Sequence, residues 1–201
     1  MLAYRLAQDS FFDDKRVLII DRIKDKGNDR TWCYWEKSNG EWDHLLEKEW
    51  PNIYFGSEYH SETINIAPYN YKMIRSEGLY KFFWTAISAK KNFKFVEDDV
   101  VDFKDETDRV VVKTKNESFI CSKLFNSIPK PQTYKKQKDY PVLQQHFLGW
   151  FIRTESAVFD DTLATFMDFN IPQNGNTRFM YILPLDQRTA FSIMDLLGNL
   201  N

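Results

Sequence analysis

The sequence predicts an α/β protein in which half of a Rossmann-like, dinucleotide-binding domain is joined to an antiparallel β-sheet domain. A helix over residues 1–10 is followed by the apolar strand 16–21, which ends in Asp21. Helix, strand and terminal acid in this order are typical of the second half of a β-α-β unit. In that unit the acid accepts a hydrogen bond from a hydroxyl of the nucleotide's ribose. A solvated strand end explains Asp21 equally well. From Leu143 onward, short alternating strands predict the antiparallel sheet.

The first half of that β-α-β unit would be a strand and a Gly-rich turn leading into the helix. No such turn precedes residue 10, since the first glycine is Gly27. The unit therefore either begins before residue 1 or is absent.

Composition limits the classes of function. The 201 residues suffice for one large or two small domains, and the aromatic content of 16% favours a core or pocket with broad apolar walls. A net charge of -2 gives no electrostatic case for nucleic acid. Cys33 and Cys121 are too few for a disulfide framework, so a reducing compartment fits best. No signal peptide or bilayer-spanning run is visible, and peripheral membrane contact stays open.

The most informative stretch is Asn28–Glu36, which holds two tryptophans, a tyrosine and a cysteine. We expect it to be a loop that is folded inward, because a surface loop is normally polar. It either fills a hole in the core or forms the wall of a site for an apolar ligand. The residues by themselves favour the core-filling role.

The first domain is predicted to span residues 1–130. A helix is expected over 41–50, ended by Pro51, and a second over Ser76–Lys91. The expected strands are 52–55, 59–66, 71–74 and 93–96, with a three-stranded meander at 99–103, 109–115 and 118–125.

Residues 129–141, with three prolines and several lysines, predict an exposed crossover and the domain boundary. The second domain, 131–201, is predicted to be a partial antiparallel sheet with strands at 145–154, 163–169, 177–183 and 188–196.

Few residues suggest chemistry. The three histidines have no partners at metal-ligand spacing, and no Gly-x-Ser-x-Gly or Cys–His arrangement predicts a nucleophile. Asp168 stands between bulky apolar residues on a predicted strand, so it is either a proton donor facing a cavity or an acid on the solvent face. Arg75, at the start of a helix, is either an anion-binding group or an exposed charge.

Several collinear segments resemble bacterial-type lycopene cyclases of the β-ring-forming class. The specific one is N-D-R-T-W-C-Y-W-E at 28–36, and the match extends to about Ala190. The weaker segments are residues 2–7, 71–75, 124–127, 145–150, 166–169 and 177–184.

The resemblance implies a flavoprotein with an FAD-binding Rossmann-like domain and an antiparallel substrate sheet. It implies reduced FAD, with NAD(P)H as the electron source, and acid-catalysed cyclisation of lycopene without net redox change. Asp21 would serve the adenosine ribose, Arg75 would lie near the cofactor, and Asp168 would be an active-site carboxylate. The candidate pocket residues are Trp32, Tyr34 and Trp35. Because lycopene resides in lipid, a cytoplasmic protein bound peripherally to membrane is expected.

The sequence departs from the family pattern at both ends. The Gly-rich turn is not found before Leu2, and Phe191–Asp195 stands where the resemblance places the main acidic motif. Asp195 is about two residues from the expected acid and a poor substitute for it. We therefore expect a partial chain with weak or no FAD binding and no cyclase activity. The alternatives are an aromatic-hydroxylase-type FAD monooxygenase and a non-catalytic carotenoid- or lipid-binding protein.

Overall fold

The computed structural model describes residues 1–129, 140 and 142–199, and it divides into two compact units. Unit 1 contains Met1–Arg30 and Ser76–Pro129, and unit 2 contains Thr31–Arg75 and the part of the chain after Pro129. The predicted division at residue 130 differs, because residues 52–56 pair with residues 163–168 of the C-terminal part. Apart from 129 and 140, the predicted crossover 129–141 lies outside the described residues.

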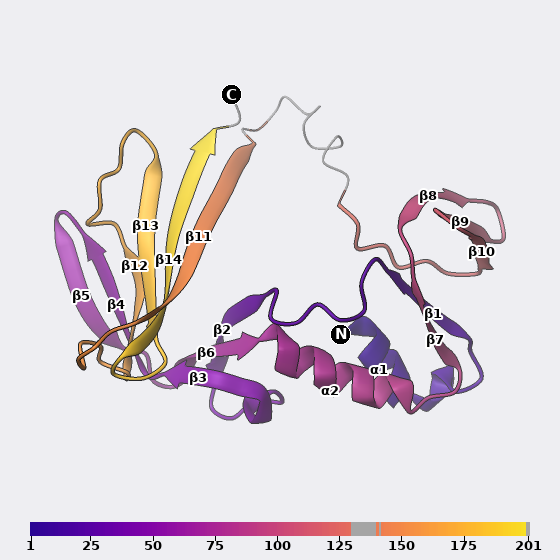
Figure 1. The fold of residues 1–201 in the computed structure, drawn as a ribbon, viewed down its shortest axis with the longest axis horizontal. Helices are drawn as coiled ribbons and strands as arrows, with labels where there is room; N and C mark the ends of the chain where they lie inside the picture. Colours follow the sequence, from indigo (N-terminus) through magenta and orange to yellow (C-terminus); the bar gives the residue numbers. More distant parts are fainter. Residues whose placement is uncertain (130–139, 141, 200–201) are drawn as a thin grey trace. The chain divides into compact units, whose positions relative to one another are not determined.

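Unit 1 is built on two parallel strands and two helices (Figure 1). Strand β1 (Val17–Asp21) pairs with β7 (Phe93–Glu97) in a register that sets Val17 opposite Phe93 and Asp21 opposite Glu97. Helix α1 (Leu2–Gln8) precedes the 3-10 turn η1 (Ser10–Phe12), and α2 (Ser76–Ser88) precedes β7. The helices pack through Tyr4, whose ring lies 5.0 Å from that of Phe83.

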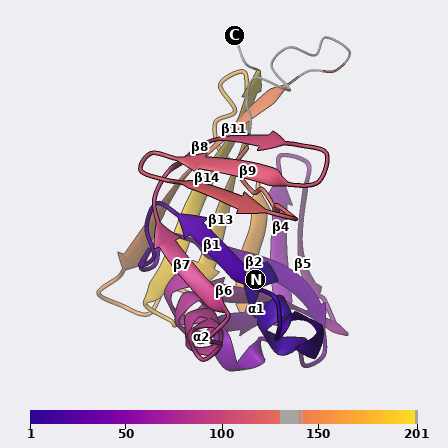
Figure 2. The same cartoon turned by 90° about the vertical axis from the view of Figure 1, so that its right-hand side faces the viewer.

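The predicted three-stranded meander is confirmed in unit 1 (Figure 2). Strands β8 (Val100–Asp105), β9 (Val110–Thr114) and β10 (Ser118–Cys121) form an antiparallel sheet with β9 in the centre. Val110 and Val112 are buried in β9, as period-2 alternation predicts for a half-buried strand.

Unit 2 contains a six-stranded sheet in the order β11-β14-β13-β12-β4-β5 (Figure 1). Its strands are β4 (Asn52–Ser57), β5 (His60–Asn65), β11 (Leu143–Arg153), β12 (Leu163–Asp168), β13 (Thr177–Pro184) and β14 (Thr189–Asn199). The sheet is antiparallel except that β12 and β4 run parallel. This pair joins the segment before Arg75 to the C-terminal strands.

The second sheet of unit 2 is three-stranded, in the order β2-β6-β3. It consists of β2 (Thr31–Lys37), β3 (Leu46–Trp50) and β6 (Tyr69–Arg75). The predicted helix over 41–50 is wrong: a short 3-10 turn, η2 (Asp43–Leu45), leads into β3. Pairing with β6 overrides the helical spacing, and it buries Trp50 completely.

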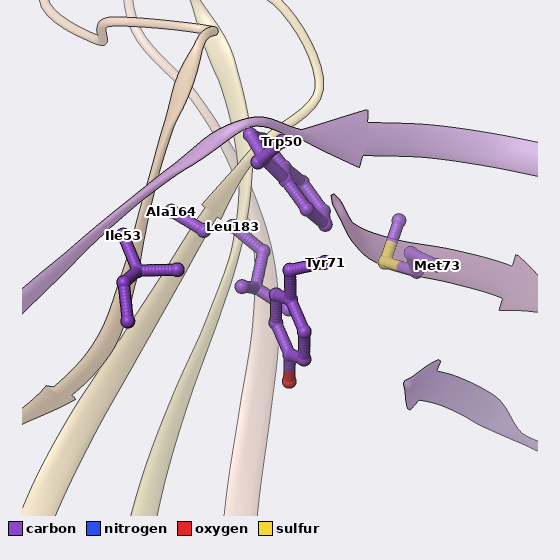
Figure 3. Packing of buried hydrophobic residues seen from close by; sticks show 6 residues of the cluster. All are labelled: Trp50, Ile53, Tyr71, Met73, Ala164 and Leu183. Carbon is purple, nitrogen blue, oxygen red and sulfur yellow. The ribbon is translucent and has the colours of Figure 1, made fainter. Parts of the chain in front are cut away.

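The core of unit 2 lies where the two sheets meet (Figure 3). Trp50, Tyr71 and Met73 come from the three-stranded sheet, and Ile53, Ala164 and Leu183 come from the six-stranded sheet. The Trp50 indole N–H donates to the carbonyl of Pro184 at 3.0 Å, so the buried ring has its polar atom satisfied.

A buried lysine fixes the turn between β2 and β3. The Lys72 side chain is 1% exposed, and its ammonium donates to Oδ1 of Asp43 at 2.6 Å and to Oε2 of Glu36 at 3.0 Å. The carbonyl of Ser38 is its third acceptor, at 3.0 Å. A buried cation needs such partners, so residues 36–43 fold around it.

Candidate functional site

Aromatic side chains gather on the core-facing side of the two sheets of unit 2. We define this aromatic face by Trp35, Tyr71, Phe151, Phe166, Phe179, Tyr181 and Phe191. The rings contact one another in sequence: Phe166 and Tyr181 lie 5.8 Å apart between centroids, and Tyr181 and Phe179 lie 5.4 Å apart. Most of these pairs meet edge to face, the arrangement that the ring quadrupoles favour.

The end of the aromatic face over β11 is open. Phe151 stacks on Phe191 with centroids 4.4 Å apart, yet it is 47% exposed, and Phe147 on the same strand is 68% exposed. Strand β11 lies at the edge of the sheet and is exposed along its whole length. Apolar side chains exposed in this number on one strand mark a surface for an apolar ligand or partner.

The predicted pocket residues of the Asn28–Glu36 stretch separate onto two faces. The expected loop is wrong from Thr31 onward, because residues 31–37 form β2 and pair with β6 in register. Successive strand residues point to opposite sides, so Trp35 lies on the aromatic face while Trp32 and Tyr34 lie on the other side of the sheet. The ring centre of Trp35 lies 4.9 Å from that of Tyr71 and 5.1 Å from that of Phe166.

Cys33 shares the inward side of β2 with Trp35, a position that the sequence analysis did not assign to the site. Burial raises the pKa of the Cys33 thiol to about 11, although a hydrogen bond with Tyr71 opposes this shift. Burial, followed by the influence of Cys33, raises the pKa of Tyr71. Both groups stay protonated near neutral pH, so they form an uncharged part of the aromatic face. Cys33 is not a nucleophile, because the thiolate is the reactive form.

Arg75 ends β6 and lies against the open part of the aromatic face. Its guanidinium carbon is 4.7 Å from the ring centre of Phe151, which is a cation–π contact. Its Nε atom is buried and has no hydrogen-bond partner among the described residues. The predicted role of Arg75 near a cofactor stays a prediction, and the structure adds its contact with an aromatic ring.

Asp21 lies at the carboxyl end of β1 in unit 1. Its Oδ2 accepts a hydrogen bond from Lys26 at 2.5 Å, and its side chain is 42% exposed. The following loop is held to α2 by Ser76, whose hydroxyl donates to the Gly27 carbonyl at 3.0 Å and accepts from the Arg30 amide at 3.1 Å. The predicted segment thus begins as an anchored loop at 28–30 before it becomes β2.

An open cleft of about 480 Å³ lies beside this loop, within unit 1. Its walls come from the loop and from α2, and they include Lys24, Tyr80, Lys81 and Trp84. The Lys24 ammonium lies 5.2 Å from the Trp84 ring centre. Asp21 is not among the lining residues, so the cleft and the predicted ribose contact are separate features.

Asp168 lies at the end of β12 and is half-buried. It pairs with Met180 of β13, and opposed residues of an antiparallel pair point to the same side of the sheet. Since Phe179 and Tyr181 point to the aromatic face, Asp168 lies on the opposite side. Its Oδ1 accepts a hydrogen bond from the backbone N–H of Asn170 at 3.0 Å.

Asp195 of β14 is the carboxylate on the aromatic face. It is 3% exposed and stands opposite Phe179 of β13 and Phe147 of β11. Its Oδ2 accepts a hydrogen bond from the Gln145 side-chain amide at 2.6 Å. The signal in the sequence was its period-2 spacing from Phe191 and Ile193, which places all three on one side of a strand.

Metal and membrane-spanning features were also sought in the described part of the chain. No group of three histidine, cysteine, aspartate or glutamate residues is arranged there to hold a metal ion. None of the helices described is long and apolar enough to cross a bilayer.

Comparison with known proteins gives one family. The family described as "Lycopene cyclase protein" matches residues 1–192. No curated protein has significant sequence similarity to the chain.

Solved structures with this fold include a flavoprotein/dehydrogenase and a protein in complex with FAD. A flavoprotein/dehydrogenase from Cytophaga hutchinsonii superposes with a TM-score of 0.59 at 10% identity, covering 97% of this chain and 52% of that one. CtdE in complex with FAD gives a TM-score of 0.58 at 8% identity, covering 98% and 56%. The tetracycline destructase Tet(55) gives 0.53 at 10% identity, covering 96% and 52%. The chain spans about half the length of these proteins and has the fold of that part.

Proposed function

The chain belongs to the lycopene cyclase protein family, and on that premise we propose that it binds lycopene on the aromatic face of unit 2 and closes its ψ ends to β-rings. The proposed reaction is acid-catalysed and involves no net oxidation or reduction. A carboxylic acid protonates the end of the polyene, the resulting cation closes to a ring, and a proton is lost. Asp168 is the acid that the sequence predicts for this role, but its side chain lies on the side of the sheet opposite the aromatic face.

The observation that carries the proposal is the aromatic face itself. Its rings offer a wide apolar surface to a long hydrocarbon, and the part over β11 is open to solvent. Ring faces attract a cation, by roughly 0.5–2 kcal/mol for each well-placed ring. The neutral Cys33–Tyr71 pair adds no charge that would compete with the cation. These features favour a substrate that is apolar at rest and positive in the transition state.

The cofactor of the proposed reaction is FAD, since the fold is that of flavoproteins. Asp21 fits a ribose contact: it is half-exposed at the carboxyl end of β1, and a ribose hydroxyl could replace Lys26 as the donor to its Oδ2 atom. Arg75, with a buried Nε–H that lacks an acceptor among the described residues, would face an anionic part of the cofactor. No Gly-rich turn occurs in the chain, so no residue is assigned to the pyrophosphate.

Bound FAD would supply a reduced, anionic flavin that stabilises the cation, with NAD(P)H as the electron source.

Lycopene is held in lipid, so we propose that the protein works in the cytoplasm at a membrane surface, as a peripheral protein. The open apolar strand β11 supports contact with lipid or with a lipid-borne substrate.

The proposal is tested by incubating the purified chain with lycopene in detergent micelles, FAD and NADPH, and separating the carotenoids by chromatography. The sequence predicts no cyclase activity, because the Gly-rich turn and the expected acidic motif are missing. The aromatic face favours activity instead, so we expect lycopene to be bound and carotenoids with β-rings to appear. Bound lycopene without rings would identify a carotenoid-binding protein instead. Hydroxylation of an added aromatic acid would identify a monooxygenase, and no binding of lycopene would contradict the proposal.

A further inference from the structure

Asp195 is a buried carboxylate that the sequence predicts to be only a poor substitute for the family's main acid. It stands in the middle of β14, and only 3% of it is exposed. One oxygen, Oδ2, accepts from the neutral Gln145 amide at 2.6 Å, whereas Oδ1 is buried and has no hydrogen-bond partner among the described residues. A buried carboxyl oxygen without a partner is costly, so its retention requires an explanation.

The surroundings of Asp195 are those of the aromatic face. Phe147 and Phe179 are its direct neighbours on the two adjoining strands. Tyr181 also lies close to Asp195. Burial raises the pKa of the Tyr181 phenol most, and the electrostatic effect of Asp195 raises it next. Met180, the partner of Asp168, is on the other side of the sheet, so the two carboxylates do not share a face.

We propose that Asp195, rather than Asp168, is the acid that faces the apolar ligand on the aromatic face. This inference rests on the proposed function for the identity of the ligand. In the protonated form the Oδ1–H bond breaks, its proton goes to a terminal carbon–carbon double bond of the ligand, and the double bond's electrons form the new C–H bond. The remaining carboxylate keeps its hydrogen bond from Gln145. Loss of a proton from the closed ring to this carboxylate restores the acid, so no oxidant or reductant is needed.

Access to Asp195 is possible from β11. Gln145 and Phe147 are both exposed, although Gln145 is bonded to Asp195 and Phe147 stands opposite it. Rotation of an exposed side chain such as that of Phe147 occurs in picoseconds to nanoseconds. It would open Oδ1 while Gln145 stays bonded to Oδ2, without any change of the backbone. Gln145 is therefore a positioning residue that holds one oxygen while leaving the other to the ligand.

The inference is tested by binding in two separate assays with the isosteric variants Asp195→Asn and Asp168→Asn. Dodecylammonium in detergent-free buffer, an apolar chain with a cationic end, probes for a carboxylate on the apolar face. Lycopene in micelles probes the face itself. We expect Asp195→Asn to lose at least about tenfold in affinity for dodecylammonium, whereas Asp168→Asn changes less than about twofold. Lycopene binding by the unchanged protein shows whether the face takes a carotenoid.

Equal dodecylammonium binding by Asp195→Asn and the unchanged protein would overturn the inference, and so would an equal loss in Asp168→Asn. If neither variant nor the unchanged protein binds lycopene, the proposed function fails, while the dodecylammonium result still decides which acid faces the surface. Near-ultraviolet circular dichroism verifies the fold of each variant.

A labelling experiment on the unchanged protein avoids any folding defect. Dicyclohexylcarbodiimide is apolar and reacts with carboxyl groups in apolar surroundings, and mass spectrometry locates the adduct. We expect an adduct at Asp195 that lycopene suppresses at least about fivefold, a ratio that corresponds to roughly 1 kcal/mol. An adduct at Asp168 alone, or none at Asp195, would overturn the inference.

Discussion

The indole of Trp35 lies edge-on against the ring of Phe166, with centroids 5.1 Å apart and an interplanar angle of 74°. This contact joins β2 of the three-stranded sheet to β12 of the six-stranded sheet, and it sets one wall of the aromatic face. Trp32, three residues earlier, lies on the other side of β2 with a similar exposed fraction, 39% against 42% for Trp35. Trp32 is therefore a matched control for Trp35: it has the same side chain and a similar exposure, but it lies on the other side of the sheet.

Replacing Trp35 with alanine is expected to weaken lycopene binding by about tenfold, which corresponds to roughly 1.4 kcal/mol. The same change at Trp32 should leave binding within about twofold, because its side chain does not reach the aromatic face. Titration of each variant with lycopene in micelles, followed by tryptophan fluorescence, checks this. Equal losses in the two variants would contradict the assignment of faces.

The buried ammonium of Lys72 predicts a large effect on stability. Changing Lys72 to methionine leaves Glu36 and Asp43, each 30% exposed, without their shared cation. We expect the free energy of unfolding to fall by about 2–3 kcal/mol, less than for fully buried carboxylates because water reaches both. Lys81→Met is the control: this lysine is 74% exposed, and its loss should leave the free energy of unfolding nearly unchanged. Denaturant titration measures both, and equal values would refute the structural role.

The same cluster predicts a dependence of stability on acid pH. The hydrogen bond from Lys72, followed by that from the Gly40 amide, lowers the pKa of Asp43. A carboxyl whose pKa is lower in the folded state adds stability that is present above its unfolded pKa, about 3.9. This contribution is lost as the pH falls through the lower folded pKa. As the pH falls below about 4, the free energy of unfolding of Lys72→Met should decrease less than that of the unchanged protein. If the two proteins show parallel profiles of stability against pH, Lys72 does not lower the pKa of Asp43.

The thiol of Cys33 should react slowly. Its pKa is raised to about 11 by burial, so at pH 8 its thiolate fraction is roughly a hundredfold below that of a thiol with a pKa near 9. We expect the variant Cys121→Ser, in which Cys33 is the remaining cysteine, to react with iodoacetamide at a rate that still rises above pH 10. A plateau near pH 9 would show that the thiol is not buried as described.

Much of the fold could be predicted from local patterns. The alternation in β8–β10 and β11–β14 and the apolar face of α2 gave nearly correct positions because these elements pair or pack with neighbours close in sequence. The segment 41–50 could not be predicted, since Leu46 and Trp50 fit helical spacing as well as strand alternation. The strand is favoured over the helix by pairing with β6 and by the hydrogen bond from the Trp50 indole N–H to the distant Pro184 carbonyl.

The site was predicted less completely. The aromatic residues at 32–35 are evident in the sequence, but which of them point inward depends on the register with β6. Asp168 and Asp195 both stand on strands between apolar residues, and only the bulge in β12 and the pairing of β13 decide their faces. Gln145 has no local signal, because its role comes from a contact with β14, fifty residues away.

The central claim is that a proton, not a hydride, starts the reaction on the aromatic face. The most direct measurement is mass spectrometry of the carotenoid formed from lycopene in D₂O with FAD and NADPH. The acid exchanges its proton with solvent between ring closures, and the proton lost from each ring is not the one that was added. We therefore predict one deuterium for each β-ring formed. Rings without solvent deuterium, or with deuterium delivered from labelled NADPH, would contradict the account.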